Sequence, residues 1–84
     1  MVTLLYFASL RETLGCSREQ VALAGSTNTV SSLVDQLRSR DGRWPEALAA
    51  GQQWRVAVNQ QVADLATPIK PGDEIAFFPP VTGG

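Results

Sequence analysis

The sequence predicts a small α+β domain in which a mixed β-sheet packs against one main helix. The chain has 84 residues, a length that is typical of a single hydrophobic core. Residues 30–37 repeat apolar side chains at helical spacing, and short segments rich in β-branched and aromatic residues lie on both sides of them. An amphipathic helix must bury its apolar side, and a sheet with this helix across one face is the simplest way to do so.

Two strands and a short helix are expected before the main helix. Residues 2–7 (VTLLYF) form an apolar, β-prone run and predict the first strand. Ser9 is followed three residues later by Glu12, which matches a capping box, so a short helix is expected to begin there. Gly15 is expected to end this helix, and residues 19–23 predict the second strand because they alternate in part between polar and apolar.

The main helix has the clearest pattern. Its apolar residues fall at i, i+3, i+4 and i+7 and form one stripe of Val30, Leu33, Val34 and Leu37. Asn28 or Thr29 is expected to cap its start, and Gly42 is expected to end it. A second short helix is expected to have Pro45 at its first position and to end at Gly51.

Three more strands are expected in the second half of the chain. Residues 54–58 predict the third strand, and the Asn59-Gln60 turn leads back into a short strand at 61–63. Pro71-Gly72 suits the centre of a type II turn, after which residues 74–78 predict the last strand. With the main helix as the crossover between the strand groups, this order is that of the β-grasp, or ubiquitin-like, fold.

The composition argues against catalysis by the side chains of this chain. There is no histidine, which excludes Ser-His and Cys-His mechanisms. Cys16 is the only cysteine, so it can form neither an internal disulfide nor a thiolate zinc site, and no metal site is expected. The seven basic residues are balanced by eight acidic ones, which gives a net charge of −1, and they form no basic stripe along the sequence. Nucleic acid is therefore not an expected partner. No apolar run is long enough for a membrane span and no secretion signal is present, so we expect no membrane partner and a cytoplasmic location.

The chemistry is therefore expected in a flexible C-terminal tail that follows the β-grasp domain of residues 1–78. The tail consists of Pro79, Pro80, Val81, Thr82, Gly83 and Gly84. The two prolines favour an extended conformation, in which six residues reach at most about 20 Å. The terminal glycines have no Cβ and can pass through a narrow channel, and the Gly84 carboxylate becomes reactive only if a partner activates it.

Three segments carry a resemblance to a known family. They are Leu5-Tyr6-Phe7-Ala8 with Arg11-Glu12 and Gly15, then Val58-Asn59-Gln60, and finally residues 72–84 (GDEIAFFPPVTGG), which are the most specific of the three. Through them the sequence resembles the sulfur-carrying small subunits of molybdopterin synthase, which act in molybdenum cofactor biosynthesis. The resemblance extends over nearly the whole chain.

The resemblance implies a cycle of activation and sulfur transfer. An adenylyltransferase of the ubiquitin-activating type would use ATP to convert the Gly84 carboxylate to an acyl-adenylate, and a sulfur donor would convert that to a thiocarboxylate. The loaded carrier would then dock with the large subunit of molybdopterin synthase and donate its sulfur to cyclic pyranopterin monophosphate, forming the dithiolene of molybdopterin. The enzyme of this family is a heterotetramer of two small and two large subunits. The resemblance places the catalytic side chains on the large subunit and implies no cofactor bound to the small one.

A docking surface is expected on the face of the sheet that points away from the helix. Because side chains alternate along strands, Phe7 and Phe78 are expected on this face, near the origin of the tail, and Val62 is expected to join them. The activating enzyme and the large subunit would use this surface in turn, so that their encounters with the carrier exclude each other.

Other functions remain open. A sulfur carrier for another pathway, such as thiazole formation in thiamine synthesis, shares the fold and the terminal glycine pair, but such carriers usually are shorter and lack the Phe-Phe-Pro-Pro run. A ubiquitin-like protein modifier shares the chemistry up to the adenylate and then forms isopeptide bonds to lysines. A plain interaction module, with incidental glycines, would undergo neither reaction.

Overall fold

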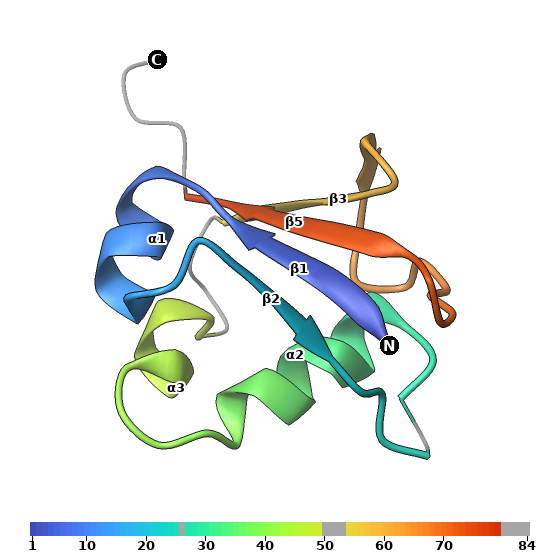
Figure 1. The fold of residues 1–84 in the computed structure, drawn as a ribbon, viewed down its shortest axis with the longest axis horizontal. Helices are drawn as coiled ribbons and strands as arrows, with labels where there is room; N and C mark the ends of the chain where they lie inside the picture. Colours follow the sequence, from blue (N-terminus) through green and yellow to red (C-terminus); the bar gives the residue numbers. More distant parts are fainter. Residues whose placement is uncertain (26, 50–53, 80–84) are drawn as a thin grey trace.

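The computed structural model describes residues 1–25, 27–49 and 54–79. In this part of the chain, one sheet carries all the helices on a single face (Figure 1). The elements in chain order are β1 (Val2–Tyr6), α1 (Ala8–Leu14), β2 (Arg18–Val21), α2 (Val30–Arg38), α3 (Trp44–Ala47), β3 (Arg55–Val58), β4 (Gln61–Ala63) and β5 (Glu74–Phe78). Within the same residues, no helix has the length and apolar character that crossing a membrane requires.

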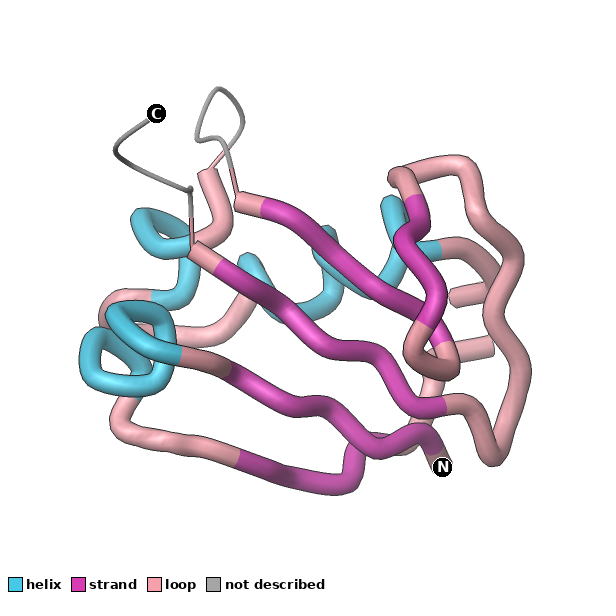
Figure 2. The backbone as a smooth tube through the Cα atoms, turned by 90° about the horizontal axis from the view of Figure 1, so that it is seen from above, coloured by secondary structure: helices cyan, strands magenta, loops and turns pink. Residues whose placement is uncertain are grey.

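The sheet has the topology that the sequence predicts. Its strand order is β2-β1-β5-β3-β4, so the first and last strands of the chain are neighbours. β1 and β5 pair in parallel, whereas the other neighbouring strands are antiparallel. α2 follows β2 and precedes β3 in the sequence. It crosses the covered face of the sheet, as a β-grasp fold requires (Figure 2).

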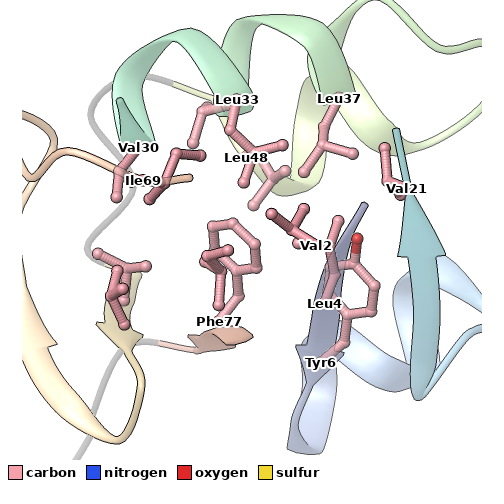
Figure 3. Packing of buried hydrophobic residues seen from close by; sticks show 14 of the residues in the cluster. Val2, Leu4, Tyr6, Val21, Val30, Leu33, Leu37, Leu48, Ile69 and Phe77 are labelled. Atoms are coloured by element: carbon pink, nitrogen blue, oxygen red, sulfur yellow. The ribbon is translucent and has the colours of Figure 1, made fainter. Parts of the chain in front are cut away.

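The core lies between α2 and the covered face of the sheet (Figure 3). The predicted stripe of α2 is buried, which confirms the predicted helix and its inner side. It meets the alternate residues of β1 and β5 that are at most 1% exposed, namely Val2, Leu4, Tyr6, Ile75 and Phe77. Leu48, directly after α3, is also fully buried, although the sequence did not single it out.

α2 begins as predicted but ends earlier. Thr29 is its N-cap: the Thr29 side chain accepts a hydrogen bond from the Ser32 backbone N–H (3.2 Å), and Ser32 Oγ accepts one from the Thr29 N–H (3.0 Å). The helix ends at Arg38, so the prediction that Gly42 ends it is wrong. The α-helical hydrogen bonding stops there because the Arg40 N–H donates to the Leu37 carbonyl (3.1 Å), three residues back instead of four. The Arg40 side chain pairs with Glu19 on β2, and Gly42 (φ 84°) lies in the following turn.

α1 is not started by the predicted capping box. β1 stops at Tyr6, and Phe7 is the N-cap in extended conformation with no side-chain cap hydrogen bond. Ser9 therefore lies inside the helix, where it cannot cap it, and Ala8 takes up the change of direction with a positive φ of 51°. Gly15 ends the helix as predicted, with φ 70° and its N–H donated to the Arg11 carbonyl (2.9 Å).

α3 is held by a polar and aromatic network that the sequence did not reveal. Pro45 is its second residue rather than its first, and Gly51, the predicted end, lies outside the described residues. Trp44 packs edge-on against Tyr6, with ring centroids 5.4 Å apart, and the Arg40 guanidinium lies 4.5 Å from the Trp44 ring centroid. The network joins β1 to the connection between α2 and α3.

Glu19 on β2 is the polar centre of this network. Arg40 donates to both of its carboxylate oxygens (2.8 and 3.1 Å), and the Tyr6 hydroxyl donates to one of them (2.8 Å). Burial, reinforced by the hydrogen bond to Glu19, raises the pKa of Tyr6 far above its ordinary value. Tyr6 therefore stays a neutral donor across the physiological pH range.

The β3–β4 hairpin turns on two residues with positive φ, Asn59 (51°) and Gln60 (69°), which confirms the predicted turn. Asparagine tolerates this conformation, whereas glutamine is strained in it. We expect Gln60→Gly to raise the free energy of unfolding by about 0.5–1 kcal/mol, measured by urea denaturation. Gln61→Gly is the matched control: Gln61 lies in β4, where glycine should destabilise. A lower midpoint for Gln60→Gly would contradict the turn geometry.

Candidate functional site

The predicted tail begins where β5 ends. β5 stops at Phe78, and Pro79, the first tail residue, is half-buried. The remaining tail residues that the sequence singled out, Pro80, Val81, Thr82, Gly83 and Gly84, lie outside the described residues, and the roles assigned to them stay predictions. The described part of the chain therefore shows the surface around the origin of the tail.

Phe7 and Phe78 form a stacked pair beside this origin. Their ring centroids are 4.8 Å apart with an interplanar angle of 4°, and the residues are 40% and 36% exposed. The Phe7 N–H donates to the Phe77 carbonyl (3.2 Å), which extends the β1–β5 pairing by one residue and places Phe7 next to Phe78. The predicted outward orientation of both rings is confirmed, and together they form the aromatic pair of this surface.

Val62 lies on the same face but at a distance from the aromatic pair. It is 87% exposed and pairs with Ala57, which in turn pairs with Ala76, two residues before Phe78 on β5. Because directly paired residues share a face, all of these side chains lie on the face that the helices leave free. β3 separates β4 from β5, and the pairing partner of Val62 on β5 lies two residues before Phe78, which sets Val62 about 12 Å from Phe78.

Between these apolar residues the free face carries only small side chains. Ala57 and Ala76 are paired at its centre, and their methyl groups are flanked along the same row by Leu5 and Val62. The free face thus has the large aromatic pair at one end and the small side chains of Ala57 and Ala76 at its centre. The sequence did not single out Ala57, because its place depends on the pairing of β3 with β5, which only the fold establishes.

A pocket of about 160 Å³ opens on the other side of the tail origin. It lies between α1, α3 and the start of the tail, and its lining residues are Ser9, Leu10, Thr13, Glu46, Ala47, Trp54 and Pro79. Trp54 is fixed by the hydrogen bond from its Nε1 to the Ala49 carbonyl (3.4 Å) and by edge-on packing against Phe77 (5.8 Å). No local sequence pattern joins α1 to α3, so the sequence could not predict this pocket.

The described residues offer surfaces for docking and little for chemistry. Among them, no three His, Cys, Asp or Glu side chains come close enough together to hold a metal ion. Cys16 is half-buried after α1, and its thiol donates to the Arg18 carbonyl (3.4 Å).

Comparisons with known proteins agree with this architecture. The ThiS family model matches residues 4–84. The molybdopterin synthase sulfur carrier subunit of Escherichia coli (strain K12) is 40% identical over 84 residues, which cover 100% of both chains. Among solved structures, SAMP1 from Haloferax volcanii superposes with a TM-score of 0.75 at 29% identity, over 99% of this chain and 98% of that one.

A second solved structure is a protein–protein complex of subunits 1 and 2 of the molybdopterin-converting factor from Helicobacter pylori 26695. The match has a TM-score of 0.66 at 28% identity and covers 99% of this chain and 97% of that one. The family model spans nearly the whole chain, and the Escherichia coli relative matches over its full length. The chain therefore belongs to the ThiS family.

Proposed function

We propose that this chain is the sulfur-carrier small subunit of molybdopterin synthase. The observation that carries the proposal is the origin of the tail, at the end of a central strand and directly beside the exposed Phe7–Phe78 pair. A partner that covers the aromatic pair is thereby in reach of the tail. The full-length similarity to a molybdopterin synthase sulfur carrier subunit supports this pathway over thiazole formation and over protein modification.

In the proposed cycle, the Gly84 carboxylate attacks the α-phosphate of ATP on an adenylyltransferase, and pyrophosphate leaves. AMP is a much better leaving group than a carboxylate oxygen, so a sulfur donor can displace it and leave a thiocarboxylate. The sulfur then stays covalently attached, which raises its effective concentration at the large subunit compared with free sulfide. Two sulfurs make one dithiolene, so two loaded carriers serve each product, as in a heterotetramer of two small and two large subunits.

The free face of the sheet is the proposed docking surface for both partners. This surface is apolar. It presents the large rings of the Phe7–Phe78 pair and the small side chains of Ala57 and Ala76 to a partner. Because the adenylyltransferase and the large subunit would cover the same rings, the carrier has to leave one before it binds the other. The cytoplasm as the site of this cycle stays a prediction.

Phe78→Ala is expected to weaken binding to the large subunit by about 2 kcal/mol or more, roughly a thirtyfold rise in Kd. The melting temperature should change little, since Phe78 is 36% exposed and lies outside the core. Isothermal titration calorimetry and thermal unfolding test the two expectations. Val62→Ala is the matched control: it is on the same face but farther from the tail, so its loss of affinity should be smaller. A large loss of folding stability with normal affinity would show that Phe78 serves the core instead.

The proposed function is tested by loading and transfer. The chain is co-expressed with the adenylyltransferase and sulfur donor, and its intact mass is expected to rise by the difference between sulfur and oxygen. The loaded chain is then mixed with the large subunit and cyclic pyranopterin monophosphate, and molybdopterin is measured. Loading without molybdopterin would indicate a carrier for another pathway, attachment to lysines would indicate a modifier, and an unchanged mass would indicate an interaction module.

A further inference from the structure

The pocket beside the tail origin has a mixed character. Leu10 is 6% exposed, and Ala47 and Trp54 are half-buried, so these three residues form an apolar floor. The exposed lining residues Thr13 and Glu46, with Ser9, form a polar rim. Such a combination suits a side chain that has both an apolar stem and a polar end.

Among the described residues that line the pocket, only Glu46 is charged. Its carboxylate has no ion-pair partner among residues 1–25, 27–49 and 54–79, where the pairs are Arg38–Asp35, Arg40–Glu19 and Lys70–Asp73. The sequence outside these ranges contains neither lysine nor arginine. Among the described residues, the Glu46 carboxylate at the rim of the pocket therefore has no direct ion-pair partner.

A lysine or arginine side chain matches this pocket in size, shape and charge. A cavity of about 150 Å³ accommodates a group as large as benzene, so 160 Å³ leaves room for one long side chain. Lysine and arginine bury their methylene stems along apolar surface and keep the charged end at the edge. The stem would lie on Leu10 and Trp54, and the cation would reach Glu46.

The pocket is continuous with the proposed docking surface. Pro79 lines it and directly follows Phe78, while Phe7 is the N-cap of α1, whose first turn supplies Ser9 and Leu10. A partner that covers the aromatic pair and holds the tail is therefore adjacent to the pocket. We propose that the large subunit inserts a lysine or arginine side chain into this pocket and pairs it with Glu46, an inference that rests on the proposed function.

The test measures the Kd of the large subunit for a series of variants at low and at high salt. Glu46→Gln is expected to raise Kd by about tenfold, and Glu46→Lys by about a hundredfold through like-charge repulsion. The salt dependence of binding should be smaller for Glu46→Gln than for the wild-type chain, because one screened ion pair is lost. Asp41→Lys is the matched control, since it makes the same charge change at an exposed residue outside the pocket, and it should stay within about threefold of wild type.

A second variant tests the pocket without changing its charge. Ala47→Met fills the space that the inserted stem would occupy and is expected to raise Kd by about tenfold. Thermal unfolding of each variant verifies that the domain is folded. If wild type binds and the Glu46 variants bind within about threefold of it, the inference is overturned while the proposed function stands. If wild type neither loads sulfur nor binds the large subunit, the proposed function itself fails.

Discussion

Deletion of Gly84 is expected to abolish sulfur loading and to leave the free energy of unfolding unchanged. Phe77 on β5 is the last buried core residue in the described part of the chain, and we expect the residues of the tail to contribute nothing to the core. The new terminus would fall one residue, about 3.3 Å, short of the adenylating site. Intact mass after co-expression with the activating enzyme measures loading, urea denaturation measures stability, and molybdopterin formed with excess large subunit measures transfer.

Three companion variants locate the reactive group. A residue added after Gly84 should also prevent loading, because the reactive carbonyl becomes an amide and the new carboxylate overshoots. Gly83→Val should be nearly as harmful, since a branched side chain is excluded from a narrow channel. Cys16→Ser should load and transfer sulfur normally. Normal turnover by the Gly84 deletion, or loss of turnover in Cys16→Ser, would place the sulfur elsewhere in the chain.

Leu33→Ala is expected to lower the free energy of unfolding by about 2–5 kcal/mol. Leu33 lies in the middle of the α2 stripe with no exposed surface, so the substitution leaves a cavity between the helix and the sheet (Figure 3). The total free energy of unfolding of a domain of this size is only about 5–15 kcal/mol, so the loss is a large share of its stability.

The matched control for this substitution is Leu65→Ala. Leu65 is 49% exposed in the loop after β4, and its truncation should change the free energy of unfolding by less than about 0.5 kcal/mol. Both variants are compared by urea denaturation. An unchanged midpoint for Leu33→Ala would mean that the packing of α2 against the sheet is wrongly assigned.

The features that the sequence predicted correctly depend on residues close together in the chain. The stripe of α2, its cap at Thr29, the end of α1 at Gly15 and the turn at Asn59-Gln60 are each encoded within one or two turns of backbone. The outward orientation of Phe78 likewise follows from alternation along a single strand.

The features that were missed depend on distant residues. α2 ends at Arg38, just before Arg40 pairs with Glu19, twenty-one residues away in the sequence. Phe7 replaces the predicted capping box because its backbone continues the pairing of β1 with β5. The pocket at Glu46 likewise needs α1, α3 and the start of the tail to be brought together by the sheet. Short-range patterns contain no information on such contacts.

The position of β5 between β1 and β3 has a consequence for protein synthesis. The ribosome makes the chain from its N-terminus, so the strand that completes the middle of the sheet is among the last segments to emerge. β1 and β3 have no common neighbour until β5 arrives, and the domain cannot close around its core before then. A nascent or truncated chain that lacks β5 therefore also lacks the folded surface on which a partner would dock. The order of translation thus delays formation of the free face of the sheet until β5 has been made.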